Sequence, residues 1–519
     1  MLKEHKDACE NSSFINNVVG NKILTGNLDY ITNYEEKLKS ITTKDIQDFI
    51  DKYVNLNKAA VTVVHPNTTV DKLNKNHSEA SSLNFRGKRK PVNTDKVTAI
   101  GLKNNINAMF LENNNDNIYY AINYDYPPQY NTKNPAARLV LQEILSMGTM
   151  NQTEEEFNKY NENNNIEIMT SLDPKQMTFV GYSNYENFEK TFNKTKELIY
   201  SPRITEETVQ KAVKRLKDSI TRSEDTSRSV YRDYDAKNNP LGHSKAEILE
   251  GLEKITASDV KELHNYILSN ASANIIMNSP AGKNIKEVAK YQFETLKTVK
   301  PHTIYTPEVY KPNNETVVLT KEKNVAQADI MQTFKYEFGD TPKEHALGNI
   351  MNTLLSNSSI GLFTILREKE HLAYKVSSNN THIGNCGELS CKIKTTTDDK
   401  ANKEISYDNV QKSINGFNRQ IKALMNSEYT DQDLENAKRM LKASLLNNES
   451  TISKLIAIEQ GTNKKEGIEF RNMIYNEIDK ITKEDIQQYA QKVFKNPPVY
   501  TVVASKETLE ANKGFFETL

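Results

Sequence analysis

The segment ITASDVKELHNYILSNASANIIMNSP, residues 255–280, decides the fold, because its pattern occurs three times in this chain. The other copies are ITTKDIQDFIDKYVNLNKAAVTVVHP at 41–66 and ITKEDIQQYAQKVFKNPPVYTVVAS at 481–505. Each copy has a Thr just before a short amphipathic stretch, and an Asp three positions after that Thr. This spacing predicts a helix that the Thr caps. A β-branched run then predicts a strand that closes the segment.

The distance between copies is roughly 200 residues, which indicates duplicated whole domains, since solenoid repeats run to about 20–50 residues. The first copy begins at residue 41, so we expect it to close a unit whose body is missing from this chain. The expected order is a C-terminal remnant of a unit at 1–66, a linker at 67–96, a full unit at 97–281, a second linker at 282–310, a full unit at 311–506 and a tail at 507–519.

Hydrophobic periodicity predicts the same order of elements in both full units. We expect each unit to be α+β, with an antiparallel sheet packed against helices. In the unit at 97–281 the pattern predicts strands near 107–111, 118–124, 166–172 and 177–182, and helices near 135–147, 185–198 and 206–223. In the unit at 311–506 it predicts a hairpin (316–320 and 329–336), helices near 343–355, from 362, and at 407–427 and 430–447, and a strand from 374.

Composition excludes several classes of protein. The 519 residues hold 68 basic and 68 acidic side chains, so no net field favours nucleic acid or an acidic membrane. The basic run at 86–90 lies in the first expected linker, and we interpret it as solvated. No apolar run approaches the ~18 residues that span a bilayer, and the N-terminal residues present here lack a signal-peptide core. Cys386 and Cys391 could pair, but free thiols are favoured because three cysteines are too few for a disulfide framework.

One segment carries a specific chemical signature: LLSNSSIGLFTILREKEHLAYKVSS, residues 354–378. It resembles the M16 (insulinase/pitrilysin) metallopeptidase family, whose later units carry Leu-Phe-x-x-Leu-Arg-Glu-Lys-x-x-Leu-Ala-Tyr-x-Val-Ser. The chain matches that pattern at eleven positions from Leu362 to Ser377. The duplicated units and their closing segments fit the same family, so the resemblance covers nearly all of 1–506. It implies tandem units of the LuxS/metallohydrolase-like type.

The resemblance implies roles for Arg367 and Tyr374. Tyr374 would donate a hydrogen bond to the oxyanion of the tetrahedral intermediate, and Arg367 would hold a substrate carbonyl or the developing charge. Donors aimed at developing charge are what acyl transfer requires. The structural alternative is that Arg367 pairs with Glu368 or another neighbour and that Tyr374 is an ordinary strand aromatic.

The zinc motif of the family, His-x-x-Glu-His with a further Glu roughly 75 residues on, is absent. Its expected place holds Leu139, Gln142 and Glu143, followed by Gly148-Thr149 where the family has Gly-Thr. Leucine cannot ligate a metal, glutamine cannot act as a general base near neutral pH, and the distal position falls near Asp218. This unit therefore resembles a degenerate one, and we expect no metal there. Two segments, 341–345 and 367–371, lack only the first His of the motif, and we interpret neither as a metal site.

The leading hypothesis is the C-terminal, non-zinc-binding half of an M16-like zinc endopeptidase that acts on peptides or unfolded polypeptides. This chain would hold no cofactor, and zinc would sit in a missing N-terminal catalytic half, its expected partner. The alternative is a stand-alone, non-catalytic subunit that binds peptides or scaffolds a complex. The resemblance permits an exported or periplasmic protein, but the sequence leaves the compartment open.

Overall fold

The computed structural model describes residues 40–54, 97–113, 117–128, 134–164, 166–280, 285–301, 308–400, 402–446 and 469–519, with a few isolated positions besides. The chain divides into two compact units, Met1–Gly87 and Lys88–Leu519. The division falls inside the linker expected at 67–96. None of the described helices has the length and apolar character needed to span a bilayer.

In the first unit, helix α6 (Thr43–Tyr53) is the part of the expected remnant that the structure describes best. Thr42 caps it as predicted: the Asp45 backbone N–H donates to Thr42 Oγ1, and the Thr42 backbone N–H donates to the Asp45 carboxylate. Its apolar face, formed by Ile46, Phe49, Ile50 and Tyr53, is 42–62% exposed. The predicted closing strand at 61–64 lies outside the described residues, as does most of the remnant before residue 40.

The second and third copies of the repeat form the same capped helix followed by a strand. Thr256 and Asp259 cap α14 (Ala257–Asn270), and Thr482 and Asp485 cap α21 (Lys483–Val493). The strands that follow are β6 (Ser272–Pro280) and β13 (Val499–Ala504). Here the apolar faces are buried, because each helix packs into the core of its own body.

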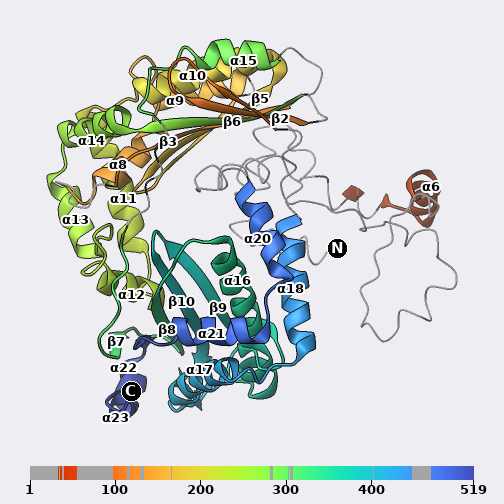
Figure 1. Ribbon diagram of the computed structural model, residues 1–519, viewed down its shortest axis with the longest axis vertical. Helices are drawn as coiled ribbons and strands as arrows, with labels where there is room; N and C mark the ends of the chain where they lie inside the picture. The colour runs from red at the N-terminus through yellow and green to blue at the C-terminus, as the bar shows by residue number, and fades with distance from the viewer. Residues whose placement is uncertain are drawn as a thin grey trace. The chain divides into compact units, whose positions relative to one another are not determined.

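The first sheet has six strands in the order β1-β2-β6-β3-β5-β4. Figure 1 labels β2, β3, β5 and β6 of this sheet, with α10 (Phe188–Tyr200) and α15 (Ile285–Phe293) on one side of it. Along β3, Ile118, Tyr120, Ile122 and Tyr124 lie at alternate positions and enter the first core. The intervening Ala121 and Asn123 are buried as well, so both faces of this central strand are covered. The predicted α+β arrangement, an antiparallel sheet packed with helices, is confirmed, and among the described strands of this sheet only β2 and β6 run parallel. The other strands of this sheet are β1 (Val97–Gly101), β2 (Asn107–Asn113), β3 (Asn117–Asp125), β4 (Glu167–Leu172) and β5 (Gln176–Asn184).

Helices cover one face of this sheet and enclose the first core. Phe188 and Phe192 of α10 (Phe188–Tyr200) pack their rings against Tyr120. The predicted linker at 282–310 instead contains α15 (Ile285–Phe293), whose Ile285, Ala289 and Phe293 enter this core. The remaining helices that the structure describes in this part of the chain are α8 (Ala137–Ile144), α9 (Glu154–Asn163), the short η6 (Tyr185–Asn187), α11 (Glu206–Arg222), α13 (Lys245–Lys254) and α12 (Ser227–Asp235), of which α12 packs elsewhere.

The second sheet has five strands in the order β7-β13-β8-β10-β9. The closing strand β13 lies between β7 and β8, parallel to β7 and antiparallel to β8, so the hairpin predicted from 316–320 and 329–336 does not form. β6 occupies the corresponding place between β2 and β3 in the first sheet. The strands are β7 (Val317–Glu322), β8 (Gln327–Glu337), β9 (Lys375–Ile383) and β10 (Cys386–Thr396), with a small separate ribbon of β11 (Asp398–Asp399) and β12 (Glu404–Ile405).

The second core lies between this sheet and its own helices. In α17 (Asn409–Met425), Val410, Ile414, Phe417 and Ile421 recur at helical spacing on the buried face. The predicted tail at 507–519 contains α22 (Lys506–Ala511) and α23 (Lys513–Phe516), which also pack against this core. The other helices are α16 (Pro342–Asn357), the π-helix η7 (Phe363–Lys369), α18 (Asp431–Leu446) and α20 (Phe470–Ile478).

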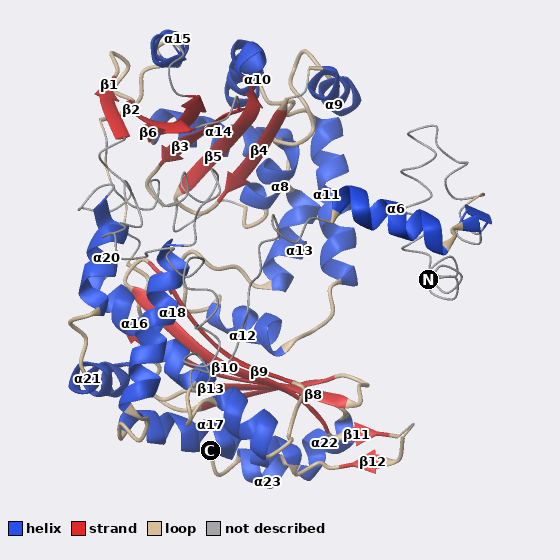
Figure 2. Ribbon diagram, turned by 90° about the vertical axis from the view of Figure 1, so that its right-hand side faces the viewer, coloured by secondary structure: helices blue, strands red, loops and turns tan. Residues whose placement is uncertain are grey.

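Helix α12 belongs in sequence to the first full unit but packs on the second sheet. Tyr231 contacts Met331 and Val499, on the face of that sheet turned away from its own helices. Figure 2 shows α12 on the opposite side of the sheet from α17. The two faces of the second sheet are therefore covered by different parts of the chain.

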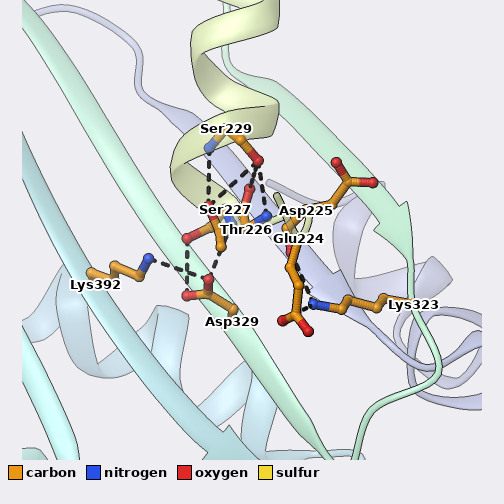
Figure 3. Close-up of polar contacts among 8 residues, drawn as sticks. All are labelled: Glu224, Asp225, Thr226, Ser227, Ser229, Lys323, Asp329 and Lys392. Atoms are coloured by element: carbon orange, nitrogen blue, oxygen red, sulfur yellow. Dashed lines mark hydrogen bonds and ion pairs between the residues drawn. The ribbon is translucent and has the colours of Figure 1, made fainter. Parts of the chain in front are cut away.

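Polar contacts fix the start of α12 to β8 (Figure 3). Asp329 accepts hydrogen bonds from the backbone N–H and the hydroxyl of Ser227, at 3.1 and 3.0 Å. The same carboxylate pairs with Lys392 at 3.2 Å, and Lys323 pairs with Glu224 at 2.8 Å. At the other end of α12, Asp235 pairs with Lys335 where both side chains are mostly buried.

A tyrosine packed over a glycine occurs in each sheet. Tyr120 lies opposite Gly181, and Tyr336 lies opposite Gly387. A Cβ atom on either glycine would stand 2.1 Å from the tyrosine ring, far inside contact distance. The duplication thus includes this Tyr–Gly cross-strand pair, which the repeated sequence segment does not contain.

We expect Gly387→Ala to lower the free energy of unfolding by about 1–3 kcal/mol, because the buried ring of Tyr336 must move. Urea denaturation followed by circular dichroism measures the change. Gly514→Ala is the matched control, since a Cβ there meets nothing within 4 Å. Equal midpoints for the Gly387→Ala variant and the wild type would contradict the packing argument.

Candidate functional site

The Arg367 segment forms a π-helix, η7, instead of the expected α-helix. π-Turns are rare and occur frequently at functional sites. The Glu370 backbone N–H donates to the Ile365 carbonyl, five residues back, at 2.9 Å. Leu366 anchors the segment in the second core, where its side chain fills the space over Gly416 of α17. Leu366 thus fixes the buried side of η7, and Arg367 lies outside this buried contact.

Arg367 and Tyr374 lie together. The guanidinium carbon of Arg367 is 4.8 Å from the centre of the Tyr374 ring and 4.6 Å from that of Phe363. Tyr374 itself is 84% exposed, an unusual state for an aromatic at the start of a strand. Two aromatic rings thus orient the guanidinium, and the tyrosine hydroxyl stays open to solvent.

The structural alternative for Arg367 does not apply within the described residues. There, neither Glu368 nor any other carboxylate forms an ion pair with Arg367. The neighbouring charge Glu370 pairs instead with Arg419. Among the described residues, the contacts of the Arg367 guanidinium are with the rings of Phe363 and Tyr374.

The turn between η7 and β9 is held by its backbone. His371 adopts a φ of 52°, a left-handed conformation that a non-glycine residue rarely adopts. The Leu372 backbone N–H donates to the Leu366 carbonyl at 2.9 Å, and the Leu372 carbonyl accepts from Thr395 Oγ1 at 2.6 Å. These bonds join η7 to β10 and set the direction in which β9, with Tyr374 just before it, leaves the turn.

The positions of the degenerate zinc motif lie on α8, as expected. The side-chain amide of Gln142 donates to the carbonyl of Thr170 on the edge strand β4 at 3.2 Å, so it serves a structural contact. Leu139 and Glu143 are half-buried on the same helix, and Asp218 is exposed on α11, which packs against α8. One leucine, one amide and two carboxylates do not fit a catalytic zinc ion, which needs three ligating side chains and an open position.

Gly148 and Thr149 explain why part of the motif persists without metal ligands. Gly148 has a φ of 90°, and a Cβ atom there would meet the Gln152 carbonyl oxygen at 2.5 Å. Thr149 is fully buried and donates to Glu197 at 2.7 Å. Gly148 thus permits the backbone of the turn after α8, and Thr149 ties that turn to α10 through Glu197, whatever the chemistry of α8.

The other candidates of the sequence fall elsewhere. His371 lies in the turn after η7, and His345 contacts Asp340 at 2.8 Å near the start of α16. Cys386 and Cys391 are buried free thiols five residues apart on β10, so they face opposite sides of the strand and cannot pair. Burial raises the pKa of Cys386 to about 11, which keeps it protonated at neutral pH.

Comparison with known proteins shows similarity to peptidases of the M16 family. A family model described as the peptidase M16 inactive domain matches residues 254–441. The beta subunit of the mitochondrial-processing peptidase from Saccharomyces cerevisiae is 21% identical over 415 residues, which cover 75% of this chain and 86% of that protein.

Two solved structures show the same fold at low identity. A protease from Helicobacter pylori superposes with a TM-score of 0.66 at 16% identity, over 79% of this chain and 99% of the other. The ferredoxin protease FusC, solved in complex with Arabidopsis ferredoxin, superposes with a TM-score of 0.63 at 14% identity. That match covers 92% of this chain but 56% of FusC, so this chain spans about half of the longer protein.

Proposed function

We propose, since this chain carries a C-terminal domain of the peptidase M16 family, that it is the non-zinc-binding half of a metalloendopeptidase. In this proposal it forms part of the proteolytic chamber and positions a peptide substrate through Arg367 and Tyr374. The observation that carries the proposal is the exposed Tyr374 ring stacked on Arg367 at the π-turn of η7. An aromatic with a purely structural role buries its ring, because removal of apolar area from water is favourable. Tyr374 instead stays 84% exposed and presents its hydroxyl to solvent.

The chemistry follows from the two side chains. Peptide hydrolysis develops negative charge on the carbonyl oxygen, and a phenol O–H stabilises that charge when it is held at hydrogen-bond distance. A guanidinium offers N–H donors in a fixed plane, which suits a carbonyl or carboxylate of the bound chain. Stacking between Phe363 and Tyr374 limits the rotation of Arg367 before substrate arrives, so less entropy is lost on binding.

Activation of water is assigned to a separate N-terminal half, because the α8 positions do not fit zinc. Of the three motif positions Leu139, Gln142 and Glu143, only Glu143 has a side chain that commonly ligates zinc. The side-chain amide of Gln142 donates a hydrogen bond to Thr170. The yeast relative is a subunit of a peptidase, which agrees with a division of labour between two polypeptides. The substrates of such a chamber would be peptides or unfolded polypeptides.

Helix α6 supports a partner of the same family. Its apolar positions Ile46, Phe49, Ile50 and Tyr53 are 42–62% exposed. The equivalent positions of α14 and α21 are at most 8% exposed, because the body of each unit covers them. We infer that α6 docks its apolar face on the body of an M16-like unit carried by the N-terminal half. The equivalent buried residues are Val260, Leu263, His264 and Ile267 in α14 and Ile486, Tyr489, Ala490 and Val493 in α21.

The second candidate is a non-catalytic subunit that binds peptides or scaffolds a complex. The match of residues 254–441 to an inactive domain favours it, since such domains lack chemistry of their own. The two candidates predict different results when a zinc-bearing partner is added: the first predicts peptide cleavage, and the second predicts peptide binding without cleavage.

The test is reconstitution. The N-terminal half, taken as the zinc-motif polypeptide encoded beside this one, is mixed with this chain, and cleavage of a quenched fluorescent peptide is followed. We expect negligible cleavage by either half alone and turnover on mixing. If the mixture binds the peptide without cleaving it, the non-catalytic reading holds. Cleavage by this chain alone would overturn both.

A further inference from the structure

A second cluster of ligating side chains lies at the end of β9 away from Tyr374. It consists of Asp340 in the loop between β8 and α16, His345 in the first turn of α16, and His382 near the end of β9. One ligand atom from each residue lies within 4.8 Å of the other two. We propose that Asp340, His345 and His382 form a binding site for Zn²⁺ or a similar divalent transition metal.

The geometry is close to what one ion requires. His345 Nε2 and Asp340 Oδ1 are 2.8 Å apart, and the His345 and His382 rings lie 4.7 Å apart at 89°. Ligand atoms about 2.1 Å from a tetrahedral ion lie roughly 3.4 Å from one another. Shifts of about an ångström would bring the three ligand atoms to that spacing, and the exposed His382 leaves the site open to an incoming ion.

Aromatic packing holds the two imidazoles in place. Phe338 stacks on His382 with ring centres 4.4 Å apart and meets His345 edge-on at 5.0 Å. Phe470 meets the other side of His345 at 5.1 Å. Groups that orient ligands before the metal arrives raise affinity, because less conformational freedom is lost on binding. The site is therefore built from three elements and supported by a fourth.

The donor set selects the kind of metal. Two imidazole nitrogens and one carboxylate suit Zn²⁺ and neighbouring transition metals, whereas Mg²⁺ and Ca²⁺ require oxygen ligands almost throughout. Three protein ligands leave room for water. Their separate origins in the β8–α16 loop, α16 and β9 mean that a bound ion would pin these elements together.

This site is distinct from both places that the family motif concerns. His382 follows Tyr374 by eight residues along an extended strand, a distance of roughly 26 Å. The degenerate motif of Leu139, Gln142 and Glu143 lies on α8, in the other core. The proposed metal thus belongs to neither the Arg367/Tyr374 site nor the family's catalytic position.

The experiment titrates the untagged, metal-stripped chain with Zn²⁺ in competition with a chromophoric chelator, and repeats the titration with Co²⁺ to follow its visible absorption. We expect one equivalent to bind, with Co²⁺ bands of a nitrogen–oxygen site. Loss of a metal-site partner commonly costs about 10–100-fold in affinity, and we expect at least tenfold from His382→Ala. His382 is exposed, so this variant should fold, and Zn²⁺ should raise the melting temperature of the wild type but not of the variant.

His371→Asn is the matched control, because it removes an exposed histidine outside the cluster and asparagine tolerates the left-handed backbone there. It should bind Zn²⁺ as the wild type does. The proposal fails if the wild type binds no metal, or if His382→Ala leaves affinity unchanged. It fails as well if Glu143→Ala, on α8, abolishes binding.

Discussion

The Tyr374→Phe variant is expected to lose about 10²–10³-fold in kcat in the assembled two-half peptidase, with KM nearly unchanged. Phenylalanine keeps the ring that stacks on Arg367 at 4.8 Å and removes only the hydroxyl. In our proposal that hydroxyl donates to the oxygen on which charge develops, so its loss weakens the transition state more than the bound substrate. Steady-state kinetics on a fluorescent peptide separates the two constants.

Tyr291→Phe is the control, since Tyr291 on α15 is also a largely exposed tyrosine, at 71%. It should retain full turnover. Both variants should unfold within about 0.5 kcal/mol of the wild type, because exposed side chains contribute little to stability. If kcat of Tyr374→Phe stays within twofold of the wild type, the hydroxyl has no part in the reaction and the tyrosine only orients Arg367.

The elements that depend on local chemistry were predictable. Thr42, Thr256 and Thr482 each cap a helix with an Asp three positions on, as the repeat indicated. The strand runs and the long helices of both units also lie close to their expected places. Local hydrogen bonding and short-range periodicity decide these features, so a single sequence carries the information.

Strand order was not predictable in the same way. The β-branched run at 499–504 indicates a strand but not its neighbours, and its partner β7 lies nearly a full unit away in sequence. Two consecutive strand patterns favour a hairpin, yet β13 separates β7 from β8. The π-helix η7 was not predictable either. Its sequence also fits an α-helix, and the packing of Leu366 over Gly416 is a tertiary contact that local sequence does not show.

Two further features of the structure have a signal in the sequence. Ile285, Ala289 and Phe293 recur every four residues, a helical stripe inside the segment interpreted as a linker. Asp340 and His345 stand five residues apart, but His382 reaches them only because β9 returns beside α16. The candidate site of Arg367 and Tyr374 could be named from sequence because both residues belong to one continuous motif.

Asp235→Ala is expected to lower the free energy of unfolding by about 3–5 kcal/mol, the largest stability effect we foresee. Asp235 ends α12 and pairs with Lys335 on β8, where the side chains are 15% and 7% exposed. Removing the carboxylate leaves an ammonium group enclosed without its partner, and that cost exceeds the net value of the pair. The chain has no tryptophan, so tyrosine fluorescence and circular dichroism follow its urea denaturation.

A double variant separates the buried charge from the packing of α12. In Asp235→Ala with Lys335→Met the charge is gone, so most of the lost stability should return even though the ion pair is absent. Glu250→Ala removes an exposed partner of Lys254, with 66% and 69% exposure, and should cost under about 1 kcal/mol. If the double variant is no more stable than Asp235→Ala, the unpaired charge is not the cause of the lost stability. Packing of Tyr231 and its apolar neighbours would then account for the stability of the contact between α12 and the second sheet.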